Sequence, residues 1–379
     1  PWFLDWGRDS LICARGLLAA GMVDEVKQLL VTFGRFEDGG TLPNSIHGED
    51  ASNRDTSDAP LWYGVVCEDF CRLAGDSILA SKVDRRGRSV TDILRSIAEG
   101  YMKGTANGIH MDSSSALIWS PPHFTWMDTN FPAATPRAGY PVEIQVLWIR
   151  LLRQLSRIDK KSTSGRWKEL AARAEQSLND RFWLEEPGYF SDLLVAPERQ
   201  KSDDAIVDTA LRSNQLFAVS LGLVKGIRAQ RSVDAAARHL VVPGALRTLA
   251  PLPVTPPLVV IGIQGQGLND PNNPYWGRYE GDEDTRRKPA YHNGTAWTWT
   301  FPSFCEALAL AWEQHPDAIQ SAKAFLGSMN RLLHEGCAGQ LPEIVDGDSP
   351  HQQRGCDAQA WGATEALRVW RWLNEVKLK

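Results

Sequence analysis

Two carboxylic acids stand in loop-forming segments whose residue types suit acid–base chemistry. Asp128 directly follows the aromatic and apolar segment 124–127. Such neighbours exclude water, which raises the pKa of a carboxyl group and keeps it protonated for use as a general acid. Glu343 follows Pro342 in an acid-rich loop, where its carboxylate could be a base that activates water. Glycoside hydrolysis requires such a pair, held farther apart in inverting enzymes than in retaining ones.

Each acid also has a simpler interpretation. Asp128 could be an ordinary turn residue, because the Asp side chain hydrogen-bonds nearby backbone in turns. Glu343 could belong to the loop scaffold, or its loop could bind calcium through Asp346 and Asp348.

Other polar residues stand at helix starts, where binding and structural roles compete. Arg8 and Asp9 could hold two neighbouring sugar hydroxyls, or Asp9 could cap the helix that follows. Glu143 could bind sugar or stabilise the dipole in the first turn of its helix. His292 could hydrogen-bond a substrate hydroxyl or lie buried with satisfied partners.

Tryptophan is frequent, at 15 residues beside 7 Tyr and 12 Phe. Flat indole rings stack on sugar faces and offer an N–H group to hydroxyls, although they could equally fill a large core. Several lie in Gly- and Pro-rich loop segments rather than on an apolar helix face: Trp2, Trp6, Trp119, Trp126, Trp276 and Trp297.

The composition is that of a globular protein and excludes several classes of function. The chain has 379 residues, 43% hydrophobic and 23% charged, and no apolar run long enough to span a membrane. A net charge of −5 provides no basic surface for nucleic acid. Six scattered cysteines indicate free thiols in a reducing compartment, so we expect a cytoplasmic protein. No CxxC, HExxH or HxxxH motif occurs, so we expect no metal site.

The elements that must position these residues are helical, because the dominant hydrophobic period is that of an α-helix. Gly21 separates the first two helices, Pro60 lies in the first turn of the third, and Pro243 follows the eighth. The expected helices are 10–21, 22–34, 57–74, 89–103, 139–158, 164–183, 208–223, 229–240, 295–314, 316–335 and 355–376.

Helical hairpins that alternate with long loops are typical of an all-α (α/α)6 barrel. The long loops, 104–138 and 242–293, carry Trp, His, Asp and Glu residues, so we expect them to form the active face. Eleven helices are one short of six pairs, so we expect the first helix upstream of Pro1, in a longer chain with an N-terminal domain. Residues 1–379 are expected to form a single domain, with local strand pairing at 108–111 and 258–262.

Taken together, six segments resemble, in order, the C-terminal glucosidase domain of glycogen debranching enzymes, the amylo-α-1,6-glucosidase family. They are WFLDWGRDS, TLPN, SDAPLWY, TWMDT with TPRAGYPVEI, YHNGTAW and LPEIVDGDSPHQQRGCDAQAW, and they extend from Pro1 to Trp361. The resemblance implies an (α/α)6 barrel that hydrolyses α-1,6-linked glucose at glycogen branch stubs, with inversion and without a cofactor. The implied partner is an α-glucan, with no nucleic acid and no membrane.

The resemblance also implies roles for individual residues. Asp128 matches the acid of the TWMD motif and would be the general acid, and Glu343 matches the acid of the PE motif and would be the general base. We expect substrate contacts from the matching segments at Trp6, Arg8, Asp9, Asp58, Trp126, Arg137, Glu143, His292 and Trp297.

Other functions remain open for such a fold, because fold alone does not determine function. A glucoamylase-like α-1,4 exo-hydrolase or a trehalase-like enzyme would cleave a different bond with the same machinery. A non-catalytic glucan-binding module would use the Trp-lined loops without chemistry.

Overall fold

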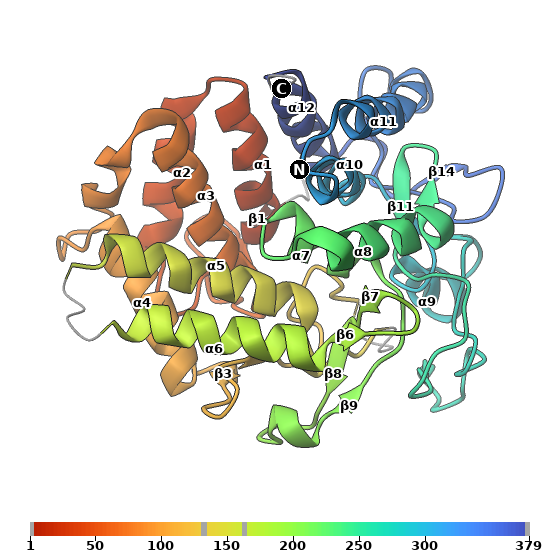
Figure 1. Cartoon of the computed structure of the whole chain (residues 1–379), viewed down its shortest axis with the longest axis horizontal. Helices are drawn as coiled ribbons and strands as arrows, with labels where there is room; N and C mark the ends of the chain where they lie inside the picture. Colours follow the sequence, from red (N-terminus) through yellow and green to blue (C-terminus); the bar gives the residue numbers. More distant parts are fainter. Residues whose placement is uncertain (1–3, 130–134, 161–164, 376–379) are drawn as a thin grey trace. The chain divides into compact units, whose positions relative to one another are not determined.

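The computed structural model describes residues 4–129, 135–160 and 165–375 (Figure 1), so Trp2 lies outside the described residues. The chain divides into two compact units. Unit 1 comprises Pro1–Trp126, Arg137–Arg181 and Ala196–Ala205, and unit 2 comprises Met127–Pro136, Phe182–Val195 and Ile206–Lys379. The single domain expected from the sequence stays a prediction.

Helices dominate the described part of unit 1. α3 packs on α1, α2, α4 and α5, and α5 also packs lengthwise on α6 (Figure 1). Most side chains of α3 are buried, which its largely apolar sequence explains. Ser89 and Asp92 form a reciprocal capping box at the start of α4. The bounds are α1 Gly7–Ala19, α2 Val23–Arg35, α3 Ala59–Ala74, α4 Val90–Lys103, α5 Val142–Ile158, α6 Arg166–Arg181, and the 3-10 turns Asp76–Ala80 and Ser202–Asp204.

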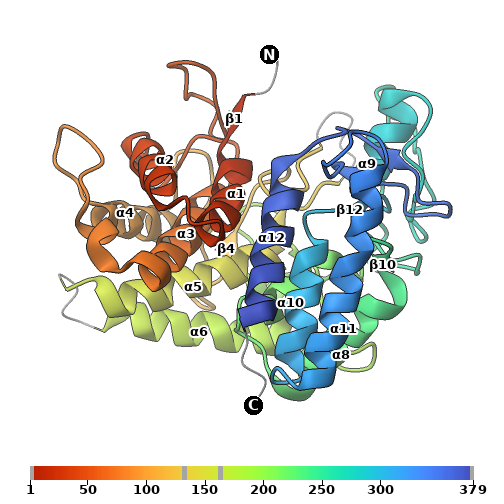
Figure 2. The ribbon, with the colours of Figure 1, turned by 90° about the horizontal axis from the view of Figure 1, so that it is seen from above.

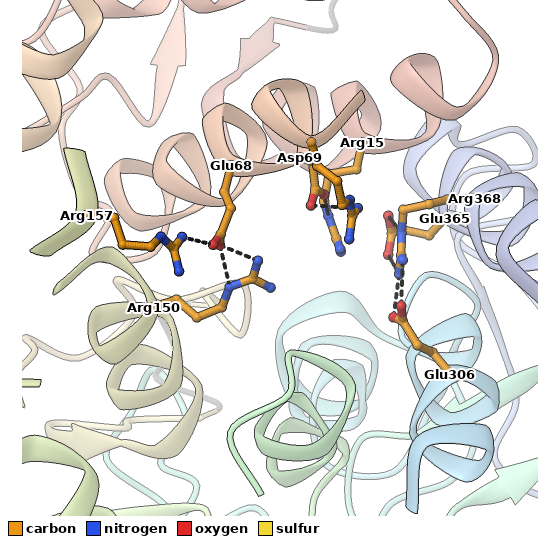
Figure 3. Close-up of polar contacts among 9 residues, drawn as sticks. Arg15, Glu68, Asp69, Arg150, Arg157, Glu306, Glu365 and Arg368 are labelled. Atoms are coloured by element: carbon orange, nitrogen blue, oxygen red, sulfur yellow. Dashed lines mark hydrogen bonds and ion pairs between the residues drawn. The ribbon is translucent and has the colours of Figure 1, made fainter. Parts of the chain in front are cut away.

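Ion pairs join the helices of unit 1 (Figure 3). Arg15 of α1 donates to the buried Asp69 of α3 at 2.9 Å. Glu68, the preceding residue of α3, accepts from Arg150 of α5 at 3.0 Å and also from Arg157. The two acids therefore connect α3 to α1 and to α5.

In unit 2, α10 contacts α7, α8, α11 and α12, and the last three can be seen beside it in Figure 2. Arg368 of α12 is buried and binds Glu306 of α10 at 2.7 Å and Glu365 of its own helix at 2.8 Å (Figure 3). The bounds are α7 Phe217–Ser220, α8 Gly226–His239, α9 Lys288–Tyr291, α10 Phe301–Ala311, α11 Pro316–Gly327, α12 Ala360–Glu375, the 3-10 turns Ser213–Leu216 and Ser328–His334, and the π-helical turn Glu283–Arg287.

A five-stranded antiparallel sheet of very short strands lies in unit 2, in the order β10-β11-β12-β13-β14. In it, Trp297 pairs with Ile344, which places the residues just after β12 beside those just before β13. The strands are β10 Val241–Val242, β11 Ala245–Arg247, β12 Ala296–Trp297, β13 Ile344–Val345 and β14 Gln353–Arg354.

The other strands form small local pairs. β3 pairs with β4, which confirms the pairing expected at 108–111, and Ile261 bridges Gly267 within the second expected segment. The strands are β1 Asp5–Trp6 with β2 Ser45–Ile46, β3 His110–Met111 with β4 Ile118–Trp119, β6 Trp183–Leu184 with β7 Tyr189–Phe190, β8 Leu193–Val195 with β9 Ile206–Val207, and β5 Gly139–Pro141.

The three largest errors in the expected helices lie at their starts. Residues 208–212 are not helical, because Asp208, Thr209 and Leu211 form backbone hydrogen bonds with other loop and strand segments. The expected helix 295–314 begins only at Phe301, because Ala296 and Trp297 are paired in the sheet. The last helix begins at residue 360 instead of 355, and the turn Glu283–Arg287 with α9 lies where a loop was expected.

In the described part of the chain, every helix is too short or too polar to cross a membrane. All six cysteines lie in the described part of the chain, and none of them forms a disulfide bond.

Candidate active site

Glu343 is held by hydrogen bonds from three directions in unit 2. Its Oε1 atom accepts from the hydroxyl of Tyr291 at 2.6 Å and from Nε2 of Gln359 at 2.9 Å. Its Oε2 atom accepts from the backbone N–H of Cys356 at 3.1 Å. Among the described residues, the donors to Glu343 are all neutral groups. They orient the carboxylate without forming an ion pair with it.

Local backbone structure fixes the same glutamate. Its N–H donates to the carbonyl of Cys356 at 2.8 Å, and its carbonyl accepts from the N–H of Thr298 at 3.2 Å. Gly355 has φ +67°, and a Cβ atom there would lie 2.3 Å from Oε2 of Glu343. Glycine at this position therefore makes room for the carboxylate.

Tyr291, the last residue of α9, links the two predicted catalytic acids. Burial raises the pKa of its phenol well above the usual value, and the charge and hydrogen bond of Glu343 raise it further. The charges of Tyr279 and Asp128 contribute in the same direction. The phenol thus stays protonated and donates to Glu343, and both acids lie within electrostatic range of it.

Asp128 is half-buried in unit 2, between two anchored residues. Met127 is buried, and its sulfur accepts from the amide of Asn214 at 3.6 Å. On the other side, the hydroxyl of Thr129 lies 2.8 Å from Nδ1 of His292. The backbone around Asp128 is therefore tied to the segment that carries Tyr291. The raised pKa expected for Asp128 itself stays a prediction.

His292 and Trp297 form one wall of aromatic side chains with Tyr291. The His292 ring stacks on Trp297, with centroids 5.2 Å apart, and Tyr291 lies 4.8 Å from each of the two rings. The indole N–H of Trp297 donates to the carbonyl of Tyr291 at 2.8 Å. This N–H therefore already has a hydrogen-bond acceptor within the protein. The indole N–H of Trp119 has one too, because it donates to the carbonyl of Ala196.

In unit 1, Arg8 and Asp58 form a buried ion pair between α1 and the start of α3. Nε of Arg8 donates to Oδ2 of Asp58 at 2.7 Å, and Thr56 donates to Oδ1 at 2.7 Å. Asp58 occupies the N-cap position of α3 but makes no capping hydrogen bond. The hydroxyl of Thr56 instead accepts from the N–H of Ala59 at 3.2 Å.

The cap expected from Asp9 is wrong, because α1 begins earlier than the sequence pattern indicates. Its first residue is Gly7 and its N-cap is Trp6, whose side chain makes no capping bond. Asp9 lies in the first turn, where its charge favours the helix dipole. A Cβ at Gly7 would lie 2.4 Å from the carbonyl of Pro43, so this close approach requires glycine.

Arg137 and Glu143 form a second buried pair in unit 1. The guanidinium binds both carboxylate oxygens, at 2.6 and 2.8 Å, and also donates to Thr125 at 2.9 Å. The neighbouring Trp126 is buried as well. The pair supports the structural interpretation of Glu143, and the sugar contacts expected here stay predictions.

The acid-rich loop that follows Glu343 uses its other carboxylates for protein contacts. Asp346 is paired with Arg354 at 3.1 Å and accepts from the N–H of Tyr279 at 2.8 Å. Asp348 accepts from the hydroxyl of Tyr275 at 2.8 Å. Among the described residues, no group of three or more His, Cys, Asp or Glu is arranged to hold a metal ion.

Sequence reasoning missed Tyr291, Gln359 and the N–H of Cys356 as partners of Glu343. All three lie in quoted segments, YHNGTAW and GCDAQAW, but nothing in their spacing indicates that they converge on one carboxylate. The antiparallel pairing of β12 with β13 and of β13 with β14 brings them together.

A family model described as amylo-alpha-1,6-glucosidase matches residues 1–255 and 260–368. The chain belongs to this family. The resemblance noted in the sequence is thereby confirmed, and it places the chain among glycosidase-type hydrolases.

The amylo-alpha-1,6-glucosidase assignment agrees with individual relatives. The glycogen debranching enzyme of Saccharomyces cerevisiae is 24% identical over 391 residues, which cover 80% of this chain and 24% of the yeast protein. The chain therefore spans about a quarter of the length of that relative.

Solved structures with low sequence identity share the fold. A glycosidase variant in complex with glucose superposes with a TM-score of 0.63 at 14% identity, over 97% of this chain and 87% of that one. An uncharacterized conserved protein from Thermus thermophilus gives 0.58 at 15% identity, over 95% and 91%. The chain thus has a helical glycosidase fold. The more specific expectation, that this fold is an (α/α)6 barrel, stays a prediction.

Proposed function

We propose that this chain is a glycoside hydrolase domain that releases glucose from the α-1,6 branch stubs of glycogen-like α-glucans by an inverting mechanism. The observation that carries the proposal is that one short segment contacts both acid regions. Tyr291 donates to Glu343 at 2.6 Å, and the adjacent His292 lies 2.8 Å from the hydroxyl of Thr129, the residue after Asp128. Family membership supplies the reaction class, and the glycogen debranching relative suggests the substrate.

In the proposed reaction, Asp128 gives its proton to the glycosidic oxygen as the bond from that oxygen to the anomeric carbon breaks. Glu343 takes a proton from a water molecule that attacks the opposite face of the same carbon. The glucose released from an α-linkage is therefore the β-anomer.

The hydrogen bonds of Glu343 suit the role of a base. A carboxylate offers roughly four acceptor sites, and two on Oε1 are used by Tyr291 and Gln359. Oε2 accepts from the N–H of Cys356, which leaves it one site for a water proton. The carboxylate is thus fixed in direction and still has the capacity to accept.

The remaining roles belong to the same proposal. Sugar contacts are proposed for Trp6, Arg8, Asp9, Asp58, Trp126, Arg137, Glu143, His292 and Trp297. We also propose a single (α/α)6 domain within a longer cytoplasmic protein, with an α-glucan as its partner and no cofactor.

The deciding experiment compares glucose release from isomaltose-type, maltose-type and trehalose substrates and follows the first-formed anomer by proton NMR. We expect the α-1,6 substrate to be preferred and β-glucose to appear first. Preference for maltose or trehalose would favour the glucoamylase-like or trehalase-like enzyme, and α-glucose as first product would reject inversion. Glucan binding without any glucose release would indicate the non-catalytic module.

A further inference from the structure

A cavity of about 450 Å³ in unit 1 is lined mainly by arginines. It lies where the end of α2 meets the loop that precedes α4. Five arginines and three acids line it, a formal excess of two positive charges, whereas the whole chain carries −5: Arg35, Arg54, Arg85, Arg86 and Arg88 face Glu37, Asp38 and Asp84. The charge of this cavity is thus opposite in sign to that of the whole chain, which favours a bound anion.

Two of these arginines are half-buried and held by contacts with the protein. Arg88 donates to Asp84 at 2.6 Å and also binds the buried Glu37, so its charge is neutralised within the protein. Arg54 donates to the carbonyls of Thr41 and Phe36, at 3.0 and 2.7 Å. Because these partners are neutral, Arg54 is fixed in place and keeps its full positive charge.

The other three arginines form the rim. Arg85 and Arg86 are exposed in the loop before α4, and the guanidinium of Arg35 lies 4.9 Å from the centre of the Phe36 ring. Within the described residues, neither Arg35, Arg85 nor Arg86 makes an ion pair with an acid. Together with Arg54, they are four arginines that make no ion pair among the described residues. Arg88 offsets only one of the three acids, so the cavity keeps its formal excess of two positive charges, which favours a bound anion.

We propose that this cavity binds a phosphate monoester attached to a sugar. Guanidinium groups bind phosphate oxygens in bidentate pairs, and a phosphate monoester carries roughly −1.5 to −2 charges near neutral pH. The formal excess of two positive charges matches such a group better than it matches neutral hydroxyls. The cavity volume lies within the usual range for small-molecule sites, roughly 300–1,000 Å³. The cavity is therefore larger than a lone phosphate would require.

The phosphate could be carried by a free sugar phosphate or by a phosphorylated glucan, and the two sources are separable. Titration calorimetry of the full chain with glucose 6-phosphate, inorganic phosphate and glucose tests the first. Cosedimentation with a phosphorylated glucan, before and after phosphatase treatment, tests the second. We expect glucose 6-phosphate to bind and inorganic phosphate to compete with it, while glucose does not bind at this cavity.

The variant Arg85→Ala/Arg86→Ala removes two rim charges that support no described contact of the fold. We expect its affinity for glucose 6-phosphate to fall by about tenfold or more. The matched control, Lys27→Ala/Lys103→Ala, removes two exposed charges of unit 1 that do not line the cavity, and its affinity should stay within about twofold.

The proposal is overturned if the wild-type chain binds neither glucose 6-phosphate at roughly 10 mM nor the phosphorylated glucan. Equal losses in the two double variants would also overturn it, because they would indicate nonspecific charge attraction. Thermal melting of each variant verifies its fold. Binding is measured separately from glucose release, so failure here and failure of the proposed hydrolase are distinguishable.

Discussion

The hydroxyl of Tyr291 donates a 2.6 Å hydrogen bond to Oε1 of Glu343. Since burial and neighbouring charges raise the pKa of this phenol, it remains a donor through the neutral range and fixes the direction of the carboxylate. Tyr291 is therefore proposed as a positioning residue for the base.

Tyr291→Phe tests this relationship. The ring packing is retained, but Glu343 loses one of its three donors. We expect kcat to fall by roughly 10- to 100-fold, the equivalent of about 1.5–3 kcal/mol for a hydrogen bond to a charged group. KM and the melting temperature should change little, and the pH–rate profile should shift because the environment of Glu343 changes.

Tyr275→Phe is the matched control. It removes another phenol–carboxylate bond of unit 2, to Asp348 at 2.8 Å, which is not part of the proposed machinery. Its kcat should stay close to that of the wild type. If Tyr291→Phe keeps full activity, or if both variants lose equally, the positioning role is wrong.

The two acids should respond differently to the leaving group. Asp128→Asn removes the proposed proton donor, so its loss of kcat should be large on a glucoside and small on α-glucosyl fluoride, whose departing fluoride needs little protonation. Glu343→Gln should be inactive on both, because water activation fails in each case. Steady-state kinetics on the two substrates measure this contrast.

The fold of both variants is verified by circular dichroism and melting. Near-normal turnover of glucoside by either variant would reject its assignment. Rescue of Glu343→Gln, rather than Asp128→Asn, by the fluoride would reverse the two roles.

Gly355→Ala should affect activity more than stability. Its Cβ would meet Oε2 of Glu343 at 2.3 Å, and the flexible carboxylate would move aside. We expect a stability loss of about 1 kcal/mol from alanine at φ +67° and a fall of kcat by tenfold or more, since small misplacements of a reacting group cost roughly that much.

Gly336→Ala provides the comparison, because it combines φ +56° with a 2.3 Å contact to the flexible amide of Gln353. Its stability loss should be similar, and its activity should be unchanged. Equal activities of the two variants would show that the room beside Glu343 is unimportant.

Acid should destabilise the chain through Asp69. Burial alone would raise the pKa of this carboxyl, but Arg15, with Arg72 and Arg150, lowers it to about 2. A depressed pKa stabilises the fold above the unfolded value of 3.8, and this contribution is lost as pH falls from about 4 towards 2. The contribution is about 2 kcal/mol.

Denaturant unfolding of the wild type and of Asp69→Asn between pH 2 and pH 6 measures this effect. The variant should be less stable near pH 6 and should show a flatter dependence of its free energy of unfolding. Parallel curves for the two proteins would contradict the assignment.

Helices with a strong amphipathic pattern could be predicted from sequence. The expected 89–103 closely matches α4, because Ser89 and Asp92 mark its start and the apolar period runs unbroken. The helix expected to begin at residue 295 begins later, because Ala296 and Trp297 pair with strands β11 and β13. These strands are distant in sequence. Strands of two residues have no detectable period.

The residue types of the candidate site could be predicted from the sequence, but the contacts between these residues could not. Solvent-excluding neighbours singled out Asp128, and Pro342 with an acid-rich loop singled out Glu343. The partners of Glu343 could not be found in this way, because Tyr291 is 52 residues away and its ring carries no charge pattern. Likewise, the capping role expected of Asp9 was wrong because the sheet and loop contacts of Gly7 set the helix start earlier.

The donors of Glu343 come from both sides of it in the chain, with Tyr291 before it and Cys356 and Gln359 after it. During translation, a nascent polypeptide that ends shortly after Glu343 would carry this carboxylate with only one of its three donors. The complete set of donors to the proposed base therefore exists only after the ribosome has synthesised residue 359.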